Sequence, residues 1–221
     1  MGYARFNDYL EPVIDELAKR HPDNHVVNIV CHGHSVPAGY FATPFVDTFN
    51  SYPHLLHVII KERFPFAVVN VIVTGKGGEN CVRSAERFTA EVLNHNPAVV
   101  TINSGFHSVL GGISPEEARA AWEKMIAEGL GRGVKLILMT PIWDQSFFKQ
   151  DDNWKERAVQ AEYIRELAAK YGLGIVDTYK LYEDYVKKDD DLTALLSHVN
   201  HPSRLAHEMI ARELARYFVA R

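Results

Sequence analysis

A serine flanked by glycines follows the first strongly apolar stretch of the chain. Residues 26–30 are rich in β-branched side chains, and residues 31–40 then read Cys-His-Gly-His-Ser-Val-Pro-Ala-Gly-Tyr, with Ser35 in the middle. A hydroxyl in such a turn is open to a reactant, but it becomes a nucleophile only when a base accepts its proton. The alternative interpretation is a serine that caps a helix or stabilises a turn, which is the more common use of serine.

A glycine-rich segment follows the second apolar stretch. Gly75, Gly77 and Gly78 fall within four residues of one another. Glycines let backbone N–H groups approach a ligand closely, and a developing oxyanion or a phosphate would be such a ligand. The spacing matches neither the P-loop nor the G-x-G-x-x-G fingerprint, so the segment does not indicate a nucleotide site.

Histidines gather after the predicted strands. Five of the eleven histidines lie in these segments: His32, His34, His107, His198 and His201. A lone histidine is more often a hydrogen-bonded bystander than a catalyst, yet imidazole is the most frequent general acid or base in enzymes. The clustering therefore indicates chemistry where these segments meet.

The elements that must position these residues alternate regularly. The apolar stretches are residues 26–30, 67–73, 98–102, 134–139 and 173–176, and helical periods cover residues 6–20, 52–64, 82–95, 114–130 and 152–171, with a last helix expected to start near Pro202. Short β-branched stretches separated by helices predict a doubly wound α/β fold with a parallel sheet. Such sheets bind ligands at the carboxyl ends of their strands, where all the polar segments above would lie.

In order and spacing, these segments resemble the SGNH hydrolases, also called the GDSL esterase/lipase family, from about Val26 to the last helix. Four blocks carry the resemblance: Gly33-His34-Ser35-Val36 with Gly39, Gly78-Glu79-Asn80, Gly105-Phe106-His107-Ser108, and His198-Val199-Asn200-His201-Pro202. The resemblance implies a flavodoxin-like three-layer α/β/α sandwich with a five-stranded parallel sheet. We expect a single domain over residues 1–221, with an N-terminal helical extension at about residues 1–22.

The resemblance also implies a serine esterase that removes acyl or acetyl groups from a carbohydrate or a small alcohol. In the family pattern, Ser35 is the nucleophile, His201 is the base, and the N–H groups of Ser35 and Gly78, together with His107, hold the oxyanion. The reaction requires no cofactor, and its partner is a small-molecule ester. We expect substrate contacts from His34, Tyr40, Trp143 and Asp144, although the two aromatic residues would suit a core equally well.

Three histidines stand where the family has other residues. His34 and His198 replace aspartates, and His107 replaces an asparagine whose donor role an imidazole N–H can fill. The change at His198 matters most, because a neutral imidazole cannot supply the negative charge that stabilises a cationic base. In the trypsin-like triad, Asp to Asn costs about 10⁴ in turnover. The chain therefore uses either a serine–histidine dyad or another carboxylate, for which Asp144 is the candidate.

Two other functions remain open from the sequence. Neutral imidazoles converging on one edge suit a tetrahedral Zn²⁺ site with an activated water, natural or engineered, and its ligands would be His34, His107, His198 and His201. A non-catalytic descendant that binds a sugar or acyl group is the third possibility, and the retained nucleophile, base and Gly78 argue against it.

Charge and hydropathy limit the classes of partner and the cellular location that we expect. The net charge is −4 without a basic block, so nucleic acid is not an expected partner. No apolar stretch is long enough to span a membrane, and the first residues lack a signal-peptide core, so we expect a cytoplasmic protein. We expect Cys31 and Cys81 to be reduced thiols. The N-terminal helix either packs on the sheet or forms a contact in a homo-oligomer.

Overall fold

Five parallel strands form the centre of the protein. The computed structural model describes residues 2–105, 112–189 and 191–219, and its strands are β1 (Val26–Gly33), β2 (Val68–Gly75), β3 (Val99–Asn103), β4 (Lys135–Met139) and β5 (Gly174–Val176). They pair in the order β2-β1-β3-β4-β5, which is the flavodoxin-like order. All five strands agree with the apolar stretches of the sequence, and the predicted fold class is confirmed.

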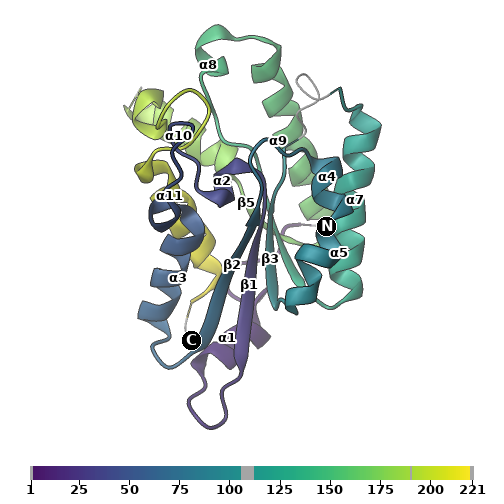
Figure 1. Cartoon of the computed structure of the whole chain (residues 1–221), viewed down its shortest axis with the longest axis vertical. Coiled ribbons are helices and arrows are strands. Elements are labelled where there is room, and N and C mark those ends of the chain that lie inside the picture. Colours follow the sequence, from purple (N-terminus) through teal and green to yellow (C-terminus); the bar gives the residue numbers. More distant parts are fainter. Residues whose placement is uncertain (1, 106–111, 190, 220–221) are drawn as a thin grey trace.

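Two helical layers cover the sheet, as Figure 1 shows. Helices α1 (Glu11–Ala18), α3 (Tyr52–Arg63) and α11 (Arg204–Leu214) bury their apolar faces in one core together with Ile29 of β1. Helices α4 (Cys81–Glu86), α5 (Phe88–Glu91), α7 (Pro115–Gly131) and α9 (Asp152–Tyr171) form the second core, which includes Val30. Adjacent residues of a strand point to opposite faces, so both faces of β1 must be apolar.

Further helices and turns lie between these elements. They are α2 (Ser35–Ala38), α8 (Ser146–Lys149) and α10 (Thr178–Asp189), with 3₁₀ turns at Thr48–Asn50, Leu93–His95, Leu192–Leu195 and Ala215–Tyr217. The helices described here include none that is both long and apolar enough to cross a bilayer.

Three helices differ in their bounds from the sequence prediction. The last helix begins at Arg204 after the N-cap Ser203, because Pro202 is engaged in a β-bridge with Leu196. The period over residues 82–95 is broken at Arg87, which ends α4 and precedes α5. The N-terminal helix, Glu11–Ala18, is shorter than the predicted residues 6–20. It packs Val13, Ile14 and Leu17 into the first core. This contact with the sheet explains its apolar face without a second subunit.

The strands end at the edge that carries the polar segments of the sequence. In Figure 1, α2 and α8 lie at this upper end of the sheet, and α1 lies at the opposite end. Gly33, the last residue of β1, has φ +147°, and a Cβ there would lie 2.0 Å from the carbonyl oxygen of Asn103. Only glycine therefore fits where the chain leaves β1 toward Ser35.

Candidate active site

Ser35 is the first residue of the short helix α2, directly after β1. The preceding residue, His34, is the N-cap, and its Nδ1 accepts a hydrogen bond from the N–H of Val36 at 3.3 Å. The same nitrogen lies 3.5 Å from the Oγ of Ser35. Gly39 ends the helix with φ +83°. The imidazole at position 34 thus replaces a carboxylate as the cap acceptor, which keeps the local conformation that presents the serine.

His201 reaches Ser35 from a tight turn before α11. Its carbonyl accepts from the N–H of Ser197 at 3.0 Å and from the Ser197 Oγ at 3.2 Å, which closes the turn. The His201 Nε2 lies 2.9 Å from the Oγ of Ser35, although 166 positions separate the two residues. This is the distance that a general base needs to accept the serine proton.

The other side of the His201 ring faces the segment that follows α2. Its Nδ1 lies 3.5 Å from the Oγ1 of Thr43, and the backbone carbonyl of Phe41 is near enough to raise the pKa of the ring. The Tyr40 ring stacks on the imidazole with centroids 5.8 Å apart. The Thr43 hydroxyl can accept a hydrogen bond from a protonated Nδ1, and in that tautomer Nε2 is free to accept the proton of Ser35.

Burial lowers the pKa of His201 below its ordinary value, and the nearby charge of His198 lowers this pKa further, whereas the Phe41 carbonyl raises it. His198 is exposed, and it stands where the resemblance predicted an orienting aspartate. Here that position opposes the cationic form of the base instead of stabilising it. The base therefore remains neutral to lower pH than a free histidine would.

Asp144 does not take over the missing carboxylate role. Its carboxylate accepts from the N–H of Ser146 at 2.9 Å and from the Ser146 hydroxyl, and it pairs with the guanidinium of Arg157. These partners occupy its oxygens, and among the described residues no hydrogen bond or ion pair joins Asp144 to His201. The site thus holds a serine–histidine pair in which the Nδ1 side of the ring contacts the hydroxyl of Thr43.

The predicted oxyanion residues are described only in part. Gly78 lies in the exposed turn between β2 and α4 and has φ +73°. A side chain there would meet no atom within 4 Å, so its backbone conformation and not lack of space favours glycine. His107 lies outside the described residues. The roles of Gly78 and His107 stay predictions.

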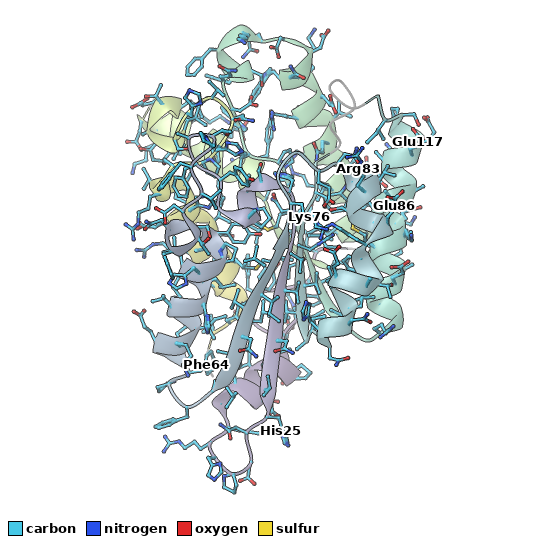
Figure 2. The ribbon with its side chains drawn as sticks, in the orientation of Figure 1. His25, Phe64, Lys76, Arg83, Glu86 and Glu117 are labelled. Carbon is cyan, nitrogen blue, oxygen red and sulfur yellow. The ribbon has the colours of Figure 1, made fainter. Side chains whose placement is uncertain are left out.

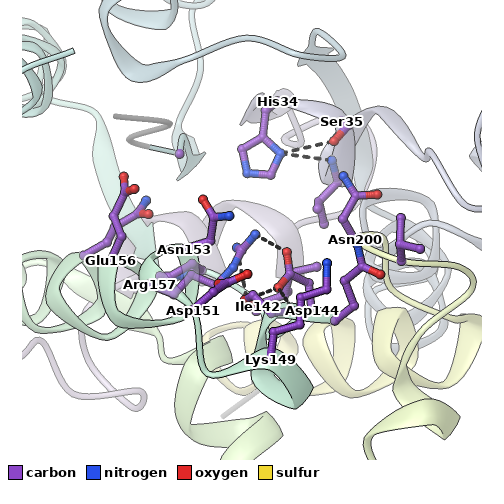
Figure 3. A pocket seen from close by; sticks show the side chains of 17 residues that line it. His34, Ser35, Ile142, Asp144, Lys149, Asp151, Asn153, Glu156, Arg157 and Asn200 are labelled. Atoms are coloured by element: carbon purple, nitrogen blue, oxygen red, sulfur yellow. Dashed lines mark hydrogen bonds and ion pairs between the residues drawn. The ribbon is translucent and has the colours of Figure 1, made fainter. Parts of the chain in front are cut away.

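A cavity of about 230 Å³ opens beside Ser35. Figure 3 shows Ser35 and the His34 ring on one side, facing Asn153, Arg157 and Asp144. Other polar residues line it as well: Gln145, Lys149, Asp151, Glu156, Gln160 and Asn200. Most of the residues that line the cavity carry a donor or an acceptor, which suits a ligand with several hydroxyl groups.

Two of the residues expected to contact the substrate lie elsewhere than in this wall. Trp143 is buried and stacks on Phe147 with centroids 4.9 Å apart, so it belongs to the core and not to the described lining of the cavity. Tyr40 contacts the base, as described above. His34 and Asp144 do line the cavity, and whether they contact a substrate stays a prediction.

Sequence reasoning missed Arg157, Asn153 and Thr43. The first two lie on α9, whose helical period gave no sign that its first turns face Ser35. Thr43 belongs to a segment without a regular period. No pattern in the sequence could have identified these three residues.

Neither the cysteines nor a group of metal ligands among the described residues supplies another nucleophile. Cys31 and Cys81 are buried and free, and burial raises the pKa of each thiol to about 12, so both stay protonated. Within residues 2–105, 112–189 and 191–219, no three His, Cys, Asp or Glu side chains are grouped to hold a metal ion. His107, one of the four expected zinc ligands, lies outside these ranges.

Comparison with known proteins gave one family and a set of similar structures. Residues 31–209 match the model of the GDSL-like lipase/acylhydrolase family. No curated protein matches the chain.

Several solved structures share the fold at low identity. A catalytic mutant of Axe2, an acetylxylan esterase from Geobacillus stearothermophilus, is 20% identical with a TM-score of 0.75, covering 88% of this chain and 95% of that one. The lipase/acylhydrolase from Enterococcus faecalis is 24% identical with a TM-score of 0.69, covering 86% and 94%. The acetyl xylan esterase AlAXEase is 19% identical with a TM-score of 0.73, covering 85% and 98%. These likenesses support the fold.

Proposed function

Because the chain belongs to the GDSL-like lipase/acylhydrolase family, we propose that it is a serine esterase that cleaves carboxylic esters through an acyl-enzyme on Ser35. The observation that carries the proposal is the 2.9 Å separation between the Ser35 Oγ and the His201 Nε2 beside an open cavity. A nucleophile, its base and space for a reactant are the parts that acyl transfer requires.

The reaction follows from these groups. The Ser35 Oγ attacks the ester carbonyl while His201 accepts its proton, and the carbonyl oxygen becomes an oxyanion. N–H groups of Ser35 and Gly78, with His107, stabilise that charge. Collapse breaks the bond to the alcohol, which leaves with the proton from His201. Water, deprotonated by the same base, then attacks the acyl-enzyme and releases the acid.

The cavity supports an ester of a polar alcohol. Its lining combines amides such as Asn153 and Asn200 with charged groups such as Lys149 and Asp151, which suits hydroxyl groups better than a hydrocarbon chain. Two of the structural neighbours carry the name acetylxylan or acetyl xylan esterase. We therefore propose acetyl or other short acyl groups on a carbohydrate or a small alcohol as the substrate, with no cofactor.

The test combines covalent labelling with turnover. A fluorophosphonate should label the protein, and labelling and hydrolysis of p-nitrophenyl acetate should both be lost in Ser35→Ala, with turnover falling about 10⁶-fold. Ser114→Ala, which changes a serine at the start of α7, is the matched control and should keep both.

Other outcomes would point to the other functions. Activity that a chelator removes and Zn²⁺ restores would contradict the serine mechanism. Binding of acetylated sugars without turnover of any ester in a panel would indicate a non-catalytic protein.

A further inference from the structure

A buried ion pair lies next to the nucleophile loop and has no part in the reaction above. Glu79 follows Gly78, and Arg87 lies between α4 and α5, and their side chains are only 8% and 10% exposed. The Arg87 Nε lies 2.8 and 2.9 Å from the two carboxylate oxygens, and its Nη2 contacts one of them. The Ser84 Oγ donates to the same carboxylate at 3.1 Å. The pair is therefore held by several charge-assisted hydrogen bonds.

This ion pair connects the two loops expected to supply oxyanion donors. The Nη2 of Arg87 also donates to the carbonyl of Gly33 at 3.3 Å, two residues before Ser35. Glu79, on the other side of the pair, is the direct neighbour of Gly78. One rigid guanidinium–carboxylate unit thus spans from the nucleophile loop to the glycine turn.

Lys76 adds a second connection between these loops. Its N–H donates to the Gly33 carbonyl at 3.0 Å, and its Nζ lies 2.7 Å from Glu91, which also pairs with Arg87 at 3.0 Å. Figure 2 shows Lys76 at the carboxyl end of the sheet, beside the helix that carries Arg83 and Glu86. The arrangement around Arg87 therefore continues to the protein surface.

A third loop joins through Ser84. The Ser104 Oγ donates to the Ser84 Oγ at 2.8 Å, and the N–H of Cys81 donates to the carbonyl of Gly105 at 2.9 Å. Ser104 and Gly105 lead into the segment that contains His107. All three loops with predicted oxyanion donors thus meet at Glu79, Arg87 and Ser84.

Stability alone is a weak reason for such a pair. Removing two charges from water costs about as much as their attraction returns, and apolar replacements of buried pairs are often neutral or stabilising. Oxyanion donors, in contrast, must lie within a few tenths of an ångström of the position that the charge will occupy.

We propose that Glu79 and Arg87, together with Ser84, are positioning residues that fix the Ser35 and Gly78 N–H groups so that both face one oxyanion. The proposal rests on the esterase function above. It predicts that replacing the pair impairs stabilisation of the transition state more than it impairs folding or binding of the ester.

The main test replaces both charges at once, with Glu79→Leu/Arg87→Met, so that no unpaired charge remains. We expect kcat for p-nitrophenyl acetate to fall about 10²-fold with KM nearly unchanged, because small displacements of reacting groups cost about this much. The inhibition constant of phenylboronic acid, whose adduct with Ser35 carries the oxyanion, should rise in parallel. The matched control, Glu123→Gln/Lys170→Gln, removes an exposed ion pair between α7 and α9 and should leave all three values unchanged.

Ser84→Ala provides a milder test that does not depend on the double variant folding. It removes one hydrogen bond to Glu79 and the contact with Ser104, and we expect about a fivefold loss of kcat, the equivalent of one net hydrogen bond. Folded variants that keep normal kcat and boronate affinity would overturn the positioning role while leaving the esterase function intact. If the unmodified protein shows no esterase turnover, and labelling persists in Ser35→Ala, both proposals are overturned.

Discussion

The two sides of Ser35 differ sharply in how firmly their groups are held. On the side of Gly78, the Glu79–Arg87 pair is buried, and the Arg87 Nε contacts both carboxylate oxygens of Glu79. The buried His32 beneath it uses both ring nitrogens, with Nδ1 3.0 Å from Thr74 and Nε2 3.2 Å from the carbonyl of Ser84.

The side of the base is bonded more loosely. The Nδ1 of His201 lies 3.5 Å from Thr43, and no carboxylate orients the ring among the contacts described. His207, buried nearby, accepts from the N–H of Tyr52 at 3.1 Å, but its Nε2 has no hydrogen-bond partner among the described residues. Under the proposed mechanism, the oxyanion loops are therefore held more firmly than the base, which acts without an orienting carboxylate.

The largest effect is expected from introducing a carboxylate that can orient the His201 ring. His198→Asp should raise kcat by roughly 10- to 100-fold, part of the about 10⁴ that an orienting carboxylate contributes in a trypsin-like triad. Steady-state kinetics with p-nitrophenyl acetate measures the change, and His198→Asn controls for loss of the imidazole. A fall in activity together with a fall in bound zinc would show that His198 is a ligand, and the dyad would be wrong.

Replacing His32 or His207 by leucine should reveal the same difference between the two sides as a difference in the free energy of unfolding. His32→Leu removes the hydrogen bonds to Thr74 and to the carbonyl of Ser84. His207→Leu removes only the hydrogen bond from Tyr52, because the Nε2 of His207 has no hydrogen-bond partner among the described residues. We expect His32→Leu to lower the free energy of unfolding by about 1 to 2 kcal/mol more than His207→Leu does. Urea denaturation measures both, and equal losses would mean that the two sides are bonded alike.

The pH dependence of activity tests the state of the base. Because burial and His198 lower the pKa of His201, the neutral base persists below its ordinary pKa of 6.5, and the acid limb of kcat/KM should lie below that pH. His198→Gln removes one of the two causes and should move the limb to higher pH. A limb at or above pH 6.5 in the unmodified protein would contradict this electrostatic account.

The smallest effect is expected at the hydroxyl beside the base. Thr43→Val keeps the shape of the side chain but removes its 3.5 Å contact, so kcat should fall about two- to threefold, less than one hydrogen bond is worth. Thr43→Ser should keep wild-type activity. A loss of tenfold or more in Thr43→Val would show that the base side is held more tightly than its distances indicate.

The acid stability of the fold provides a separate check on the neutral state of His32 and His207. Burial lowers the pKa of both His32 and His207 to about 3, so both are neutral in the folded protein. The unfolded chain takes up these protons below about pH 6.5, and each histidine then lowers the free energy of unfolding by up to about 1.4 kcal/mol per pH unit down to pH 3. Denaturation between pH 7 and 4 should show this decline, and each leucine variant should reduce it.

The order of the strands along the chain and the place of Ser35 after the first of them could be predicted from the amino-acid sequence. Apolar stretches with two buried faces can form little except strands of a covered parallel sheet, and the alternation with helices leaves one edge for polar segments. The glycines around Ser35 and the order of the four blocks therefore indicated where the site lies, and local caps such as Ser114 marked where helices begin.

Which side chains meet at that edge depends on the packing of the folded chain. The pairing of Ser35 with His201, the engagement of Asp144 by Arg157, and the burial of Trp143 depend on contacts between residues far apart in the chain. Spacing along a strand or helix fixes the direction of a side chain but not its partner across a loop. The Glu79–Arg87 pair was hidden for the same reason, because charges eight positions apart become a buried bridge only when three loops pack around them.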